Sequence, residues 1–121
     1  MLEILPVEDK VIQESLCLRF GIKFDQELMA YVAYRNGAPV GMCRFTFKNG
    51  EGILVDLSTA ETSDEQNILF SLGIAALNFI DQCGALTAKC ENKYIDPSIL
   101  SSLGLHKIKE ETYESKLREN G

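Results

Sequence analysis

Residues 28–57 read LMAYVAYRNGAPVGMCRFTFKNGEGILVDL, and this stretch decides the fold. Two Asn-Gly pairs, Asn36-Gly37 and Asn49-Gly50, divide it into three runs of mainly apolar residues. Asn-Gly between such runs is a strong hairpin signal, because both turn residues must tolerate a positive φ. The stretch therefore predicts a meander of three antiparallel strands, over residues 28–34, 39–47 and 52–57.

The period of the apolar residues changes after this meander. Between residues 64 and 83 apolar side chains recur every three or four positions, which predicts a long amphipathic helix. Gly84 stands where a left-handed residue commonly ends a helix. The apolar positions of this helix are Ile68, Leu69, Leu72, Ala76, Phe79 and Ile80.

The N-terminal segment predicts one strand and one helix. Residues 1–5 are expected to form a strand, and Pro6 is expected to open a helix that continues to about Phe20. Gly21 supplies the stop. This helix has a mixed face, made of Val11, Ile12, Leu16 (or Ser15), Leu18 and Arg19.

The C-terminal segment predicts three further elements. Residues 85–90 are expected to form a strand, and residues 97–103 a short helix that Asp96 caps and Gly104 ends. Residues 105–117, with alternating charges, predict a final strand or hairpin arm. No linker or repeat interrupts the chain, so residues 1–121 are expected to form a single domain.

Composition limits the function classes. The 121 residues are 45% hydrophobic and 25% charged, which is ordinary for one globular domain. The formal charge is −6, from 12 Lys and Arg against 18 Asp and Glu. That balance argues against nucleic acid or an anionic membrane surface as the main partner and favours a basic small molecule or a protein amine.

The cysteines and the single histidine do not predict a metal site. Cys17, Cys43, Cys83 and Cys90 form no CxxC pair, and His106 has no neighbour at metal-ligand spacing. No apolar run is long enough for a signal peptide or a membrane span. We therefore expect a reducing cytoplasm, with the cysteines as small core hydrophobes.

Two short motifs and the order of the elements resemble the GNAT acyltransferase superfamily. Members often carry a turn of the kind Asn/Asp-Gly-x-x-Val-Gly before their third strand, here residues 36–41 (NGAPVG). A late Leu-Gly-Phe is also common, and residues 103–105 read LGL. The resemblance implies an α/β (α+β) fold with a GNAT-like mixed, mostly antiparallel twisted sheet and flanking helices.

The resemblance also implies a site for acetyl-CoA. In the family the sheet splits after the last strand of the meander, and the pantetheine arm lies against exposed backbone, which would here belong to Val55, Leu57 and Ser58. The next helix begins near Ser63 and Asp64, and helix N-termini attract phosphate through free N–H groups and a partial positive charge.

The loop before the long helix departs from the family pattern. Members usually carry Gln/Arg-x-x-Gly-x-Gly/Ala there, whereas residues 58–66 read STAETSDEQ, with no Gly, Lys or Arg. Thr62 with Glu65, and Ser63 with Gln66, both match the capping box, in which a hydroxyl occupies the N–H groups that a phosphate would use. A self-capped helix start is therefore favoured over a phosphate cradle, and the chain resembles a small, degenerate member of the family.

Acyl transfer to an amine needs a base for the ammonium and an acid for the leaving thiolate. The resemblance suggests Asp56 or Glu51 as the base, although a plain strand-end hydrogen bond is the favoured role of Asp56. Leu100 stands where many members have the acidic Tyr, and Tyr94 could serve only if its loop folds inward. Asn92 matches either an Asn that contacts the cofactor arm or a turn residue.

Two functions remain open. The chain is either an N-acetyltransferase that uses acetyl-CoA and a small-molecule or peptide amine, or a catalytically inactive GNAT-like module for binding or self-association. A homodimer is plausible, because exposed sheet edges pair readily. The state of the cleft distinguishes the two, since a splayed strand and free helix amides favour cofactor binding.

Overall fold

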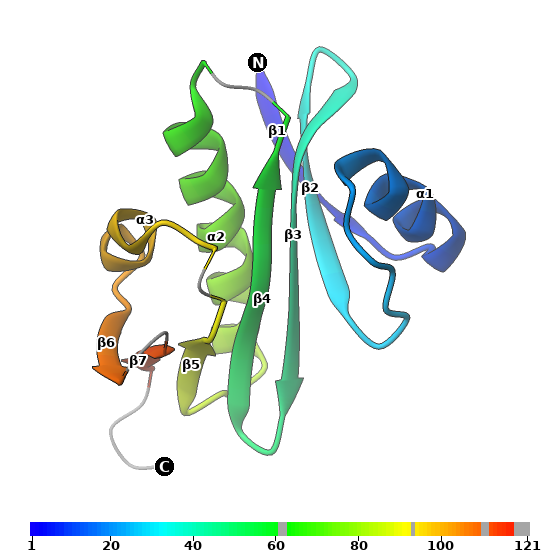
Figure 1. Ribbon diagram of the computed structural model, residues 1–121. Coiled ribbons are helices and arrows are strands. Elements are labelled where there is room, and N and C mark those ends of the chain that lie inside the picture. The colour runs from blue at the N-terminus through cyan, green and yellow to red at the C-terminus, as the bar shows by residue number, and fades with distance from the viewer. Residues whose placement is uncertain (61–62, 93, 110–111, 118–121) are drawn as a thin grey trace.

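A single mixed sheet of seven strands forms the centre of the molecule (Figure 1). The computed structural model describes residues 1–60, 63–92, 94–109 and 112–117. The strands are β1 (Leu2–Val7), β2 (Met29–Arg35), β3 (Ala38–Lys48), β4 (Glu51–Thr59), β5 (Thr87–Cys90), β6 (His106–Lys109) and β7 (Thr112–Lys116). Their order is β1-β2-β3-β4-β5-β7-β6, and β4 with β5 is the parallel pair among antiparallel ones. This arrangement confirms the predicted fold class.

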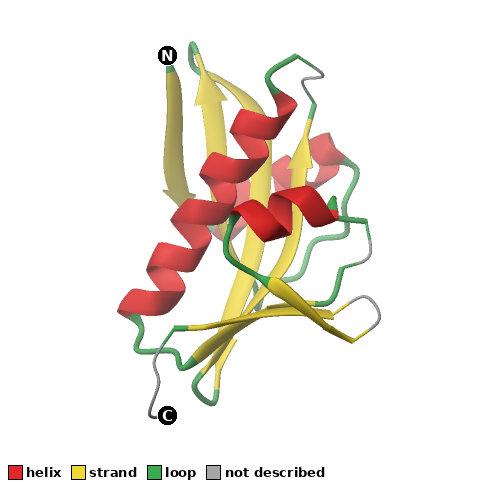
Figure 2. Cartoon of the chain, turned by 90° about the vertical axis from the view of Figure 1, so that its left-hand side faces the viewer, coloured by secondary structure: helices red, strands yellow, loops and turns green. Residues whose placement is uncertain are grey.

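Three helices cover the two faces of the sheet. The long helix α2 (Glu65–Gln82) and the short helix α3 (Pro97–Ser102) lie on one face, and α1 (Lys10–Phe20) lies on the other (Figure 2). The main core fills the space between α2 and the sheet, and a smaller cluster lies under α1. None of the helices among the described residues is long and apolar enough to cross a membrane.

The predicted meander and long helix are confirmed. Asn36, Gly37, Asn49 and Gly50 all adopt positive φ, at 54°, 80°, 53° and 77°. These values match the turn that the Asn-Gly pairs predict. Gly84 likewise takes a left-handed φ of 84° just after α2.

Helix α2 lies close to the sheet because two strand positions carry no side chain. A Cβ added to Gly52 would lie 2.2 Å from the Cγ2 of Ile80, and one added to Gly41 would lie 2.7 Å from the Cγ2 of Ile68. Both distances are shorter than van der Waals contact allows. The two glycines therefore set how closely α2 approaches β3 and β4.

The prediction that Pro6 opens the first helix is wrong. Pro6 continues β1 and pairs with Tyr31. Proline is tolerated there because β1 is an edge strand with one neighbour, so no ladder hydrogen bond need be lost. Helix α1 begins instead after Asp9, whose Oδ1 accepts hydrogen bonds from the amides of Val11 (2.8 Å) and Ile12 (3.3 Å).

The mixed face assigned to this helix is also largely wrong. Val11 and Leu18 are 76% and 83% exposed, whereas the buried side chains are those of Gln13, Leu16 and Cys17. Gln13 is tolerated inside because its amide donates to the carbonyl of Leu28 (3.0 Å). A satisfied polar side chain thus occupies a position that a hydropathy pattern assigns to an apolar one.

Candidate functional site

Strands β4 and β5 separate partway along β4. Their parallel pairing starts at Glu51 and stops at Leu54, opposite Cys90 (Figure 1). Within the described part of the chain, residues 55–59 have no strand partner on that side. The predicted opening of the sheet is therefore present, and Val55, Leu57 and Ser58 lie along it, with the backbone of Leu57 facing the opening and that of Ser58 facing β3.

Val55 is the extra residue of an irregularity in β4. Arg44 pairs with Asp56 and Phe45 pairs with Leu54, so Val55 has no partner in β3. Such a bulge bends the strand and increases its twist. The bulge coincides with the last β5 pairing, so it lies where the two strands part.

Asn92 bridges the strands at the opening. Its side-chain amide donates to the carbonyl of Val55 (3.0 Å), and its carbonyl oxygen accepts from the amide of Tyr94 (2.8 Å). The hydrogen bond to Tyr94 is the turn role that the sequence allows. The hydrogen bond to Val55 occupies, inside the protein, the side-chain amide that was predicted to contact the cofactor. Asn92 therefore shapes the opening while leaving the rest of the β4 edge free.

A cavity of about 380 Å³ lies at the free end of β4. It is lined by the predicted residues Leu57 and Ser58, and by Glu65 of the first turn of α2. Tyr94 also lines it, so the loop before α3 does reach the cleft. The further lining residues are Phe20, Thr59, Gln66, Leu69, Ile95 and Asp96.

The first turn of α2 begins at a residue other than Ser63, one of the two predicted caps. The residue before the helix is Asp64, with a left-handed φ of 67° and no side-chain cap. Ser63 is exposed and lies one residue before that cap position, so the predicted Ser63 box is wrong. Thr62 lies outside the described residues. Among the described residues, no side chain accepts a hydrogen bond from the N–H groups of residues 65–67.

Arg35 is the functional candidate that the sequence analysis missed. Its Nη2 lies 2.8 Å from Oδ2 of Asp64, an oxygen that also accepts from Asn67 (3.3 Å). Strands β2 and β4 both run antiparallel to β3, so their C-terminal ends lie at the same end of the sheet. This shared direction of the two predicted strands could have placed Arg35 beside the loop after β4, which has no positive residue of its own.

Asp56 lies on the α1 face of the sheet in a buried ion pair. Nε and Nη2 of Arg44 donate to its Oδ2 at 3.0 and 2.7 Å, and Asp56 is only 8% exposed. Its Oδ1 is buried without a hydrogen-bond partner among the described residues. Burial alone would lower the pKa of Arg44, but hydrogen bonding to Asp56 and its negative charge outweigh burial and raise that pKa.

A second cavity, of about 560 Å³, adjoins this ion pair. Arg44 and Val55 form part of its wall, and the rest comes from the segment between α1 and β2. The residues of that segment are Lys23, Phe24, Asp25, Gln26 and Leu28. Val55 therefore lies between this cavity on the α1 side and the cavity at the free end of β4.

Glu51 lies at the other end of β4. Its Oε2 accepts from Nζ of Lys89 (3.0 Å) and from Oγ1 of Thr87 (3.4 Å). The hydrogen bond to Glu51 raises the pKa of Lys89. At about 3.3 Å per strand residue, Glu51 is roughly 13 Å from Val55 along the strand. The two predicted bases are thus not brought together.

Three of the four cysteines are buried, and Cys83 is exposed. Burial raises the pKa of Cys43 to about 12 and also raises the pKa of Cys90. Cys17, Cys43 and Cys90 are core side chains, as predicted, whereas the prediction is wrong for Cys83, which lies at the exposed C-terminal end of α2. In the described part of the chain, no group of three or more His, Cys, Asp or Glu could hold a metal ion.

Comparisons with known proteins identify the fold. No protein-family model and no curated protein sequence matches the chain. Among solved structures, it resembles the ribosomal-protein-S18-alanine N-acetyltransferase of Escherichia coli with a TM-score of 0.75 at 12% identity, over 100% of this chain and 97% of that one. For the aminoglycoside 6'-N-acetyltransferase of Enterococcus faecium the TM-score is 0.73 at 10% identity, over 100% and 99%. A Bacillus subtilis acetyltransferase in complex with CoA gives 0.65 at 14% identity, over 88% and 77%. The chain therefore has the fold of the GNAT N-acetyltransferase superfamily.

Proposed function

We propose that this protein is an N-acetyltransferase that moves an acetyl group from acetyl-CoA to a primary amine of a small molecule or peptide in the cytoplasm. One observation carries the proposal. Among the described residues, β4 has no strand partner on its β5 side beyond Leu54, it carries a bulge at Val55, and no described side chain caps the first turn of the helix that follows. A fold alone does not fix an activity, so the proposal depends on this site.

The residues present fit acetyl-CoA. Beyond the Val55 carbonyl, which Asn92 occupies, the backbone of Leu57 faces the opening and matches an amide of the pantetheine arm, in the way that an added strand binds a sheet edge, and the hydroxyl of Ser58 lies beside it. No described side chain occupies the N–H groups at the start of α2, which suit the pyrophosphate, and Ser63 lies exposed beside them.

Two carboxylates near that turn oppose phosphate binding. Glu65 is exposed at the start of α2, and Asp64 precedes it. Arg35 offsets the charge of Asp64 by pairing with it. The remaining repulsion is screened by salt, because both carboxylates face solvent.

Asp56 supports the role of base better than Glu51. It follows Val55 directly, its Oδ1 has no partner among the described residues, and the cavity on the α1 side adjoins its ion-pair partner Arg44. Glu51 is held by Lys89 at the far end of the strand. Asp56 would accept the proton of an ammonium approaching Val55 from that cavity, directly or through water.

Tyr94 is the candidate acid. Acetyl-CoA supplies a thioester carbonyl that an amine can attack, and its sulfur takes up a proton on leaving. Tyr94, which is 86% exposed, is one of the residues that line the cavity shared with Leu57 and Ser58. Its hydroxyl would hold the proton for that sulfur.

Calorimetric titration with acetyl-CoA tests the proposal. Binding at or below about 100 μM, roughly −5.5 kcal/mol, is the expected result. S-acetyl-N-acetylcysteamine, which carries the thioester without phosphates, is the matched control and should bind far more weakly. An amine screen that detects released thiol should follow in a Cys83→Ser background, because Cys83 is exposed and would react with the reagent.

No heat with millimolar acetyl-CoA would overturn the transferase proposal. The acidic start of α2 would then favour the alternative, a catalytically inactive module for binding or self-association. That module would be sought by sedimentation analysis, because the two edge strands, β1 and β6, are available for pairing between copies in a homodimer.

A further inference from the structure

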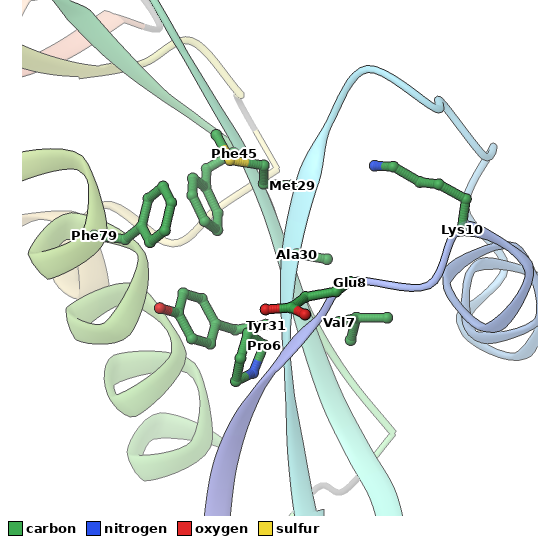
Figure 3. Close-up of a pocket in the computed structure, with 9 residues that line it drawn as sticks. All are labelled: Pro6, Val7, Glu8, Lys10, Met29, Ala30, Tyr31, Phe45 and Phe79. Carbon is green, nitrogen blue, oxygen red and sulfur yellow. The ribbon is translucent and has the colours of Figure 1, made fainter. Parts of the chain in front are cut away.

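A separate cavity of about 290 Å³ lies near the C-terminal end of α2, away from the acyl-CoA cleft (Figure 3). The ends of β1 and β3, the start of β2 and Phe79 of α2 enclose it. Asp56, which pairs with Arg44 on the α1 face of the sheet, does not line this cavity. The transferase site therefore makes no use of it.

Three aromatic rings form one wall of this cavity. The rings of Tyr31 and Phe45 stack with centroids 5.7 Å apart, and Phe45 and Phe79 meet at 5.4 Å with a tilt of 59°. Met29 extends the apolar wall above them (Figure 3). The rings come from two strands and a helix of the main core, so the wall is rigid and preformed.

A single unpaired carboxylate faces these rings. The Glu8 side chain reaches over the cavity towards Tyr31 (Figure 3). Among the described residues, it has neither a hydrogen bond nor an ion pair. Lys10 also lines the cavity, but its Nζ forms no ion pair with Glu8 and donates instead to the carbonyl of Leu28 (2.6 Å) and to Gln13 (3.0 Å).

We propose that this cavity binds a small organic cation, a protonated amine carried on an apolar or aromatic body. The negative faces of aromatic rings and a carboxylate both attract a cation, and the apolar wall takes the rest of the ligand. The Tyr31 hydroxyl has no partner among the described residues and can accept a hydrogen bond from the ligand. The volume lies at the lower end of the range for ligand pockets, so the ligand is small.

An NMR titration with 2-phenylethylammonium tests this inference. We expect saturable shifts confined to amides around Tyr31, Phe45 and Phe79, in samples without acetyl-CoA. The neutral analogue 2-phenylethanol should bind more weakly, and the anion 3-phenylpropanoate more weakly still. Glu8→Gln should weaken the ammonium roughly fivefold, since the bond to an ionised group is the stronger kind. Glu3→Gln, which changes an exposed carboxylate of β1 outside the cavity, should leave the affinity unchanged.

Three results would overturn the inference. The first is the absence of saturable shifts with millimolar ammonium. The second is equal affinity for the ammonium and the alcohol, or an affinity that Glu8→Gln does not lower. The third is a set of shifts centred on the free end of β4, which would assign the amine to the transferase site.

Discussion

Asp56 contributes both to stability, through its buried ion pair, and to the proposed chemistry, as the base. Its Oδ2 takes two hydrogen bonds from Arg44 in a buried setting. Asp56→Ala should destabilise the protein by about 3 kcal/mol, because it leaves the Arg44 guanidinium buried without its partner. Urea unfolding followed by circular dichroism measures this.

A double variant is the control for that prediction. Replacing both partners, with Arg44→Met and Asp56→Leu together, should restore most of the lost stability, because an apolar pair leaves no buried charge. A loss below about 1 kcal/mol in Asp56→Ala would show that solvent reaches Arg44 and would contradict the buried pair.

The carboxylate of Asp64 should oppose acetyl-CoA. Asp64→Asn removes a negative charge at the start of α2 and with it the ion pair to Arg35, while Asn tolerates the left-handed backbone. We expect the affinity for acetyl-CoA to rise about threefold at low salt, and Arg35→Gln to lower it by a similar factor. Calorimetry at two salt concentrations measures both, and both effects should shrink as salt increases.

The matched control for Asp64 is at the other long helix. Asp9→Asn makes the same chemical change at the start of α1, on the opposite face of the sheet, and Asn also caps well. It should leave the affinity unchanged. An equal rise in both variants would mean that net charge, rather than the position of Asp64, controls binding.

For single residues, the sequence predicted local backbone conformation correctly but did not predict contacts between residues far apart in the chain. The positive φ values of Asn36 and Asn49 are local properties and were predicted correctly. The pairs Arg44 with Asp56 and Arg35 with Asp64 were not predicted, because they join residues 12 and 29 positions apart. Their formation depends on strand register, and a bulge changes that register without a clear signal in composition.

At the scale of elements, the contact between α2 and β4 should be the least tolerant of added volume. Gly52→Ala would bring a methyl group within 2.2 Å of Ile80, so we expect a loss of about 2–3 kcal/mol in the free energy of unfolding. The same change in an Ile80→Ala background should cost much less. Equal losses in the two backgrounds, from chemical denaturation, would show that the backbone of β4 rather than Ile80 resists the change.

Boundaries between elements were predicted less well than the elements themselves. Pro6 suits the first turn of a helix and also an edge strand, and only pairing with β2 decides between them. The start of α2 was misjudged for a similar reason. Ser63 with Gln66 matched a capping pattern, but Asp64 turns left-handed and is held by Arg35, a contact that no local pattern contains.

For the whole molecule, the buried thiols predict a loss of stability in alkaline solution. The pKa of Cys43 is raised from 9.0 to about 12 by burial, so the folded protein keeps a proton that the unfolded chain releases. The contribution is complete below about pH 9 and is lost as pH rises towards 12, at up to roughly 1.4 kcal/mol per pH unit.

Unfolding measured from pH 8 to 11 tests this expectation. Cys43→Ala should flatten the decline above pH 9, although it also lowers the overall stability through the small cavity it leaves. Cys83→Ser, at the exposed cysteine, is the matched control and should keep the decline unchanged. Identical slopes in Cys43→Ala and the parent protein would contradict the role of Cys43.

The bulge at Val55 implies that this chain carries one residue more than its architecture demands. Deleting Val55 would let Leu54, Asp56 and Leu57 pair in unbroken succession with Phe45, Arg44 and Cys43, and each side chain would keep its present face. The shortened protein should fold with its core intact and its strand straight. Val55 would then be a spacer whose role is to form the opening beside it. Its deletion would show that folding does not require this residue and that ligand binding does.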